Sequence, residues 1–190
     1  MRLFTPTQSK RLNEVTGFLF LAAGLLFLLS LSSFHPQDTS WDSVSGVSRP
    51  GNLIGIVGAY ASDLFLQSFG AAAFLFPALI FALGWKWIRS EPLAAPLIKL
   101  LGSMAMVASA CGASALLPDW RIFGGTIMLG GTAGYLVADS LKHALNPAGT
   151  AVVLFTALLV STYLVSSFTL AKLETCHVSC SSTPPKRSVQ

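Results

Sequence analysis

Four long stretches without charged residues, separated by short polar segments, dominate the chain. They cover residues 15–34, 64–85, 100–118 and 148–170, and each is 19 to 23 residues long. A membrane-spanning helix needs about 20 predominantly apolar residues, because an α-helix rises roughly 1.5 Å per residue. The pattern therefore predicts an all-α integral membrane protein with four transmembrane helices.

Two further apolar segments are less regular. Residues 53–69 are interrupted by Asp63 and Gln67, which favours an interfacial helix leading into the second span. We interpret Asp63, at the mouth of that span, as an interfacial group rather than a proton or ion site. Residues 122–138 carry no charge but contain five glycines. They are expected to form a glycine-rich turn and then a re-entrant or amphipathic helix before the fourth span, with a full fifth span as the alternative.

The third span is unusually rich in small side chains. Ala105, Ser109 and Ala113 recur at intervals of four, and so do Ala108 and Gly112. Small residues at this spacing let helix backbones approach closely in a membrane. We therefore expect this span to make the main helix–helix contacts and to provide a face for homo-oligomers.

Composition supports a membrane location. The chain is 53% hydrophobic and only 11% charged, against about 25% charged in soluble domains. Residues 1–12 are expected to form a tail, 13–172 the membrane domain, and 173–190 a polar, disordered tail. The net charge of +4 comes from basic residues near the ends of the apolar runs. This distribution suits anionic headgroups, and we expect no direct binding of nucleic acid.

The basic residues also predict an orientation, because Lys and Arg favour the cytoplasmic side of short loops. Four spans place nine of them on the side of both termini: Arg2, Lys10, Arg11, Lys86, Arg89, Lys99, Lys172, Lys186 and Arg187. The other side holds three: Arg49, Arg121 and Lys142. Both termini are therefore expected in the cytoplasm. Five spans would remove this asymmetry by exporting the last three residues of the first set.

A cleaved signal peptide is the alternative reading of the first span, since Arg2, Lys10 and Arg11 precede it. Its 20 uncharged residues exceed the usual signal core of about 7–15 residues. We favour a permanent span.

No set of residues predicts catalysis. No glycine is followed by lysine, so a phosphate-binding loop of the GxxxxGK[ST] type is absent from the sequence. Cys176, His177 and Cys180 would offer three metal ligands without a fourth, which is a poor zinc site. Asp139 and His143 are one helical turn apart and are expected to pair on a polar helix face. We expect no catalytic, cofactor-binding or metal-binding residues, and no enzyme.

Several short motifs mark the loops and helix ends. They are Ser40-Trp41, the block from Gly51-Asn52-Leu53-Ile54-Gly55 to Gly84-Trp85, Ser109-Ala110-Cys111-Gly112, Gly124-Gly125 with Gly134-Tyr135-Leu136, and Asn146-Pro147-Ala148-Gly149-Thr150. Together they resemble the N-terminal four-span membrane region of the FtsK/SpoIIIE-type bacterial DNA translocases. The likeness covers about residues 10–172.

This resemblance implies a membrane anchor and assembly module that links the division septum to chromosome segregation. It implies a place in the bacterial inner membrane, with bacterial division proteins and further copies of the chain as partners. The family's ATP-hydrolysing motor and DNA-reading tail have no counterpart in these 190 residues, so neither ATPase nor DNA pumping is implied. The tail from Glu174 onward departs from the family pattern, which indicates a truncated or frame-shifted reading frame.

Two other functions stay open: a small transporter or channel subunit, and an inactive truncated gene product. Transporters more often place charged or strongly polar groups in the middle of a span. The four predicted spans carry no charged residue, which favours the anchor.

Overall fold

The computed structural model describes residues 9–38, 50–90, 95–117 and 120–166. These residues form six α-helices, one 3-10 helix and one short hairpin. Their bounds are α1 Lys10–Ser32, α2 Ile56–Phe69, η1 Gly70–Phe74, α3 Leu75–Ile88, α4 Pro96–Ser114, β1 Arg121–Ile122, β2 Ile127–Met128, α5 Gly131–Ala144 and α6 Pro147–Val165.

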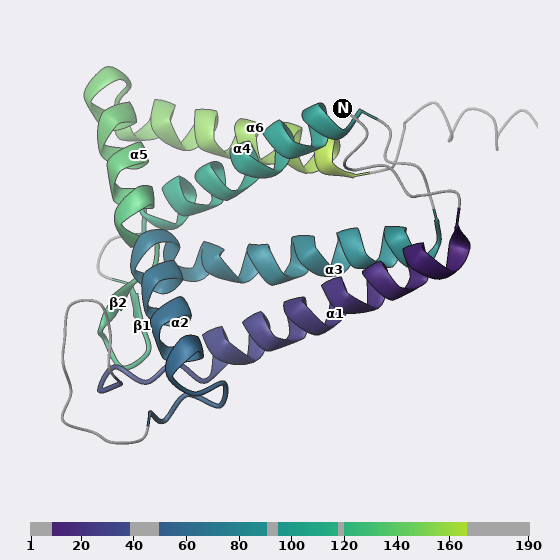
Figure 1. Cartoon of the computed structure of the whole chain (residues 1–190). Helices are drawn as coiled ribbons and strands as arrows, with labels where there is room; N and C mark the ends of the chain where they lie inside the picture. Colours follow the sequence, from purple (N-terminus) through teal and green to yellow (C-terminus); the bar gives the residue numbers. More distant parts are fainter. Residues whose placement is uncertain (1–8, 39–49, 91–94, 118–119, 167–190) are drawn as a thin grey trace, which may run out of the picture.

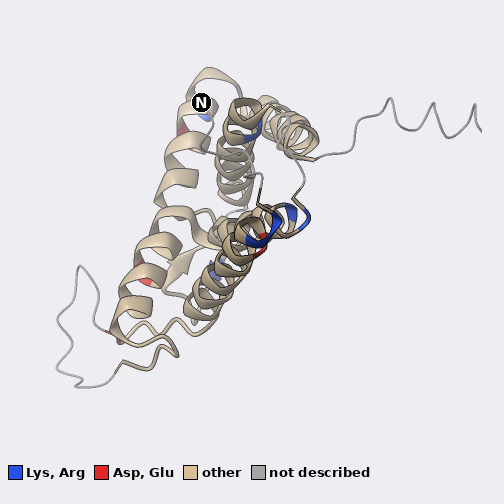
Figure 2. Cartoon of the chain, turned by 45° about the vertical axis from the view of Figure 1, so that its right-hand side comes forward, with Lys and Arg blue, Asp and Glu red and all other residues tan. Residues whose placement is uncertain are grey.

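Four helices run lengthwise and two lie across them. Helices α1, α3, α4 and α6 are roughly aligned, and α2 and α5 cross the same end of this bundle (Figure 1). In both views α2 and α5 continue one another, end to end (Figure 2). We call this end, which also holds the hairpin, the cap end. The opposite end, where α1 and α4 begin and α3 and α6 finish, is the open end.

The described residues contain four helical segments that are long and apolar enough to cross a membrane. The prediction of an all-α membrane protein with four spans is therefore confirmed. The second segment includes α2, η1 and α3 and is 33 residues long. A straight helix of that length would measure about 50 Å, well above the ~30 Å of a hydrocarbon core. The chain instead bends between α2 and α3, which gives an interfacial helix before the second span.

The bend lies at Gly70, whose φ of 58° is in the left-handed region that favours glycine. The interval predicted for the second span, 64–85, straddles this bend. Leu64 to Phe69 belong to α2, and the lengthwise part runs from Gly70 to Ile88. The uncharged run does not reveal the bend because apolar residues continue on both sides of it.

The lengthwise helices form two tightly packed antiparallel pairs, α1 with α3 and α4 with α6. Glycines bring each pair together. A Cβ atom on Gly84 would lie 3.0 Å from the carbonyl oxygen of Gly17, and one on Gly102 would lie 3.0 Å from Cβ of Leu164. The backbones of α3 and α4, by contrast, stay further apart. The two pairs are joined mainly at the cap end, through α2, η1 and α5.

The glycine-rich segment forms a hairpin followed by a short helix. Strands β1 and β2 pair antiparallel, and Gly124 and Gly125 have φ values of 69° and 90° in the turn between them. Helix α5 has 14 residues, about 21 Å, so it is too short to span. It buries Gly131, Gly134 and Ala138 on one face. The expected glycine-rich turn and amphipathic helix are confirmed, and the two short strands are a small addition to the all-α prediction.

Candidate functional site

The largest candidate surface is the outer face of the lengthwise helices. In the most apolar part of each spanning segment, only 17% to 33% of the residues are buried within the chain. Large side chains such as Leu159 and Val152 are 73% and 66% exposed. So many outward apolar residues would be costly in water and are favourable against acyl chains. This surface is suited to a lipid bilayer.

Charged side chains divide unevenly between the two ends. Among the described residues, the open end holds Lys10, Arg11, Lys86, Arg89 and Lys99, with Glu14 as the one acidic residue. The cap end holds Arg121 and Lys142, with Asp38, Asp63 and Asp139. At the open end, the Arg89 guanidinium lies 5.2 Å from the centre of the Trp85 ring. Aromatic and basic side chains together are typical of a membrane–water interface.

Asn52 is the centre of a buried hydrogen-bond network at the cap end. It is 4% exposed, and its Nδ2 donates to the carbonyl of Ser30 at 2.8 Å and to Oγ of Ser62 at 3.3 Å. Its Oδ1 accepts the backbone N–H of Ile54 at 3.0 Å. The Asp38 carboxylate accepts the backbone N–H groups of Gly51 and Asn52 at 2.6 and 2.9 Å. These contacts hold residues 51–54 against the end of α1 and against α2.

No pattern in the sequence predicted a role for Asn52 or Asp38. Asn52 lies within the Gly51 to Trp85 block of the family resemblance, but its partners are 10 and 22 residues away. No local spacing rule links such residues. Nothing in the sequence indicated that the amide is buried.

Two chain segments pass very close to each other at the centre of the cap end, each at a glycine. Gly70 follows α2 and Gly131 begins α5, with φ values of 58° and 62°. A Cβ on Gly70 would overlap the carbonyl oxygen of Leu129, and one on Gly131 would lie 2.5 Å from the backbone nitrogen of Gly70. Beside them, the N–H of Ala71 donates to the Leu129 carbonyl at 2.8 Å. Backbone touches backbone here, so this crossing joins the two helix pairs directly.

The small residues of α4 divide between two faces. Ser109 is 5% exposed, and a Cβ on Gly112 would lie 2.9 Å from a methyl group of Leu154 in α6. The prediction that this span makes close helix–helix contacts is confirmed at Gly112. Ala105 and Ala108 are exposed instead. They remain on the outer face of the described chain.

The polar residues singled out from the sequence do not come together. Nε2 of His143 lies 3.6 Å from a carboxylate oxygen of Asp139 on the outer side of α5, as the spacing predicted. Asp63 is buried on α2 and accepts a hydrogen bond from Gln67 at 2.7 Å. Cys176, His177 and Cys180 lie outside the described residues. Within the described residues, no three His, Cys, Asp or Glu side chains are grouped as metal ligands.

The fold and its surfaces define a multi-pass membrane module. Four spanning helices are joined at one end by two crossing helices, whose backbones meet at Gly70 and Gly131. A family model described as the "4TM region of DNA translocase FtsK/SpoIIIE" matches residues 9–176. The chain belongs to this family, and the expected resemblance is confirmed. The family and the four apolar helices together make it a multi-pass inner-membrane protein.

Curated relatives give the same picture. The chain is 30% identical over 134 residues to "DNA translocase FtsK" of Rickettsia typhi, covering 70% of this chain and 17% of the relative. It is 32% identical over 149 residues to "DNA translocase FtsK 2" of Ralstonia nicotianae, covering 73% and 19%. The corresponding protein of Vibrio parahaemolyticus is 28% identical over 153 residues, covering 76% and 14%. The chain thus spans less than a fifth of the length of these relatives. No solved structure gives a significant match.

Proposed function

We propose that this chain is the membrane anchor and assembly module of a DNA-translocase-like cell-division protein and links the division septum to chromosome segregation. The observation that carries the proposal is the four-helix bundle whose apolar side chains face outward. The match of residues 9–176 to a translocase membrane region supports it. A fluorescent fusion in a rod-shaped bacterium tests it. We expect the fluorescence to gather at mid-cell in dividing cells, and uniform fluorescence around the whole envelope would refute septal anchoring.

The anchor acts without ATP hydrolysis or DNA pumping by these residues. The absence of any Gly-Lys pair from the 190 residues supports this part of the proposal. So does the distribution of basic residues, which is suited to headgroups rather than to DNA. The purified chain should neither release phosphate from ATP nor shift a DNA duplex in a gel. Either activity would contradict the proposal, provided that it is absent from a mock purification made without the protein.

Both termini face the cytoplasm in this proposal, so the open end is cytoplasmic. Five of the seven described Lys and Arg residues lie at that end, as expected from the preference of basic residues for the cytoplasm. Alkaline phosphatase fused after Leu170 should be inactive, and the same enzyme inserted at Gly125 should be active. The reverse pattern would invert the topology, and activity of both fusions would indicate five spans.

The chain assembles with copies of itself and with division proteins. The exposed residues Ala105 and Ala108 of α4 support self-association, because small residues permit close approach of helices. Substituting both with leucine should shift the mass of the detergent-solubilised protein, measured by light scattering, toward a monomer. The control is the double variant Val152→Ala/Leu159→Ala on α6, which also changes two outward-facing side chains and should leave the mass unchanged. A wild-type monomer that brings down no division protein would overturn this part of the proposal.

A further inference from the structure

A group of exposed apolar side chains lies at the cap end. We call it the cap patch, and it consists of Leu117, Trp120, Met128, Tyr135 and Leu136, which are each between 51% and 67% exposed. The first four line one cavity of about 230 Å³ between the end of α4, the hairpin and α5. Leu136 follows Tyr135 on α5. Such groups of large apolar side chains mark protein-binding or membrane-binding surfaces.

The length of α4 places the cap patch at the boundary of the hydrocarbon core. Helix α4 has 19 residues, which rise about 28 Å and nearly cross a core of ~30 Å. Leu117 follows shortly after Ser114, its last residue. The hairpin is tied to the same level by the second span. The N–H of Ala71, at the start of that span, donates to the Leu129 carbonyl at 2.8 Å, and the N–H of Leu129 donates to the Trp120 carbonyl at 3.0 Å.

The start of α5 rests on the lipid-facing side of α4. Leu101, Met104 and Ala108 are exposed and share one face of α4. Ala115 continues this face just beyond the helix, and there a Cβ on Gly130 would lie 2.6 Å from Cβ of Ala115. The cap patch is therefore continuous with the surface of α4 that faces acyl chains.

The side chains of the cap patch suit this position. Trp and Tyr are enriched where a membrane meets water, because each joins an apolar ring to one polar group. Arg121 lines the cavity together with Trp120 and Tyr135. The open end has the same combination, with Arg89 over the ring of Trp85.

We propose that the cap patch binds lipid at the headgroup boundary of the leaflet at the cap end. Its depth, its continuity with the lipid-facing side of α4 and its aromatic composition select this occupant. The hairpin and the first turns of α5 are then embedded in the leaflet, while the polar second half of α5 stays among the headgroups and water. This inference depends neither on the septal role nor on which side of the membrane the cap end faces.

Quenching of tryptophan fluorescence by brominated lipids tests the proposal. The full chain is reconstituted in phosphatidylcholine vesicles with Trp41→Phe, Trp85→Phe and Trp87→Phe, which leaves Trp120 as the one tryptophan. Apolar side chains of an interfacial segment lie about 5–10 Å into the boundary. Lipid brominated near the glycerol backbone should therefore quench Trp120 more than lipid brominated at the ends of its chains. Acrylamide in the water should quench it little.

Three further reporters provide matched comparisons, each in a chain whose own tryptophans are all phenylalanine. Leu136→Trp lies in the cap patch and should behave as Trp120 does. His143→Trp lies about two turns along the same helix, on an exposed polar stretch, and acrylamide should be its main quencher. Phe155→Trp, on the exposed face of α6 within the span, should be quenched most by bromines at the chain ends.

Three results would overturn the proposal. Acrylamide quenching of Trp120 as strong as that of His143→Trp would place the cap patch in water. A quenching pattern like that of Phe155→Trp would place it inside the hydrocarbon core. Protection of Trp120 from both lipid and acrylamide would assign the patch to a protein partner, and a dimer cross-linked through Met128→Cys would then identify that partner as a second copy.

Discussion

Replacing Gly70 with alanine should be among the most damaging single-methyl changes in this chain. Three costs add at this position. The φ of 58° is strained for alanine by about 1–3 kcal/mol. Overlap with the Leu129 carbonyl adds about 1–3 kcal/mol, since a backbone atom and not a flexible side chain must move. The hydrogen bond from Ala71 to that carbonyl contributes about 1 kcal/mol more if it is lost. The total is about 3–7 kcal/mol.

Gly55→Ala provides a matched control. Gly55 has a φ of 78° and a ψ of −154°, close to the 58° and −137° of Gly70. Nothing lies within 4 Å of a Cβ built on Gly55. Its substitution therefore pays the backbone strain alone, about 1–3 kcal/mol. The difference between the two variants isolates the cost of the crossing at about 2–4 kcal/mol.

Reactivity of Cys111 is a direct assay for this junction. Its side chain is fully buried, and its Sγ lies 3.5 Å from the carbonyl oxygen of Phe69, next to Gly70. With Cys176 and Cys180 changed to serine, it is the one remaining thiol. Maleimide labelling in rising proportions of sodium dodecyl sulfate should show Gly70→Ala opening at a lower proportion than Gly55→Ala. Coincident transitions would show that the crossing is not tight and would refute the reasoning.

Two further predictions concern buried contacts elsewhere. Asn52→Ala should lower the free energy of unfolding by about 2–3 kcal/mol, because the Ser30 carbonyl and other buried groups lose their partner. Asn146→Ala is the control, because Asn146 is exposed and makes no side-chain cap bond. It should cost under about 0.5 kcal/mol. Equal effects of the two substitutions would show that the Asn52 hydrogen bonds do not stabilise the fold. Gly17→Ala should cost about 1–3 kcal/mol, because its new methyl group would lie 2.8 Å from the backbone of α3. Gly149→Ala, with only an ordinary contact at 3.4 Å, should be neutral or stabilising in the same detergent unfolding assay, and a similar loss in both would refute close α1–α3 packing.

The sequence predicted the spans because the bilayer imposes a simple rule on composition and length. Uncharged runs of about 20 residues are unusual in other settings, so the number of spans followed from where charges interrupt the chain. The same rule misses the bend at Gly70. Apolar residues lie on both sides of it, and α2 can lie across the bundle while remaining as apolar as a span.

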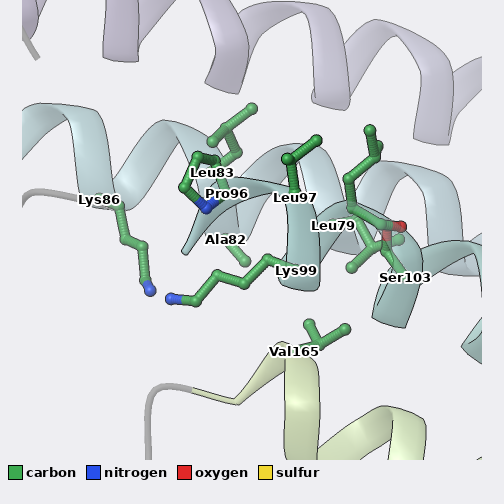
Figure 3. Close-up of a pocket in the computed structure, with 10 residues that line it drawn as sticks. Leu79, Ala82, Leu83, Lys86, Pro96, Leu97, Lys99, Ser103 and Val165 are labelled. Atoms are coloured by element: carbon green, nitrogen blue, oxygen red, sulfur yellow. The ribbon is translucent and has the colours of Figure 1, made fainter. Parts of the chain in front are cut away.

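The cap could not be predicted in detail because its contacts are distant in the sequence. The crossing of Gly70 and Gly131 joins backbones 61 residues apart, and Asn52 reaches back to α1. Each residue alone is compatible with an ordinary turn. The cleft lined by Leu83, Leu97 and Val165 was equally hidden, because its side chains come from three different helices (Figure 3).

The cap and the lengthwise helices therefore constrain the sequence in different ways. On the lengthwise helices, an outward residue such as Leu159 has only to be apolar, because lipid adapts to its shape. At the cap, Gly70 and Asn52 meet backbone atoms at fixed positions, and no other side chain reproduces those contacts. The block between Gly51 and Trp85 is constrained mainly in the second way. That block contains the Asn52 network, the bend at Gly70 and the Gly84 contact, which together set how the four helices are held relative to one another.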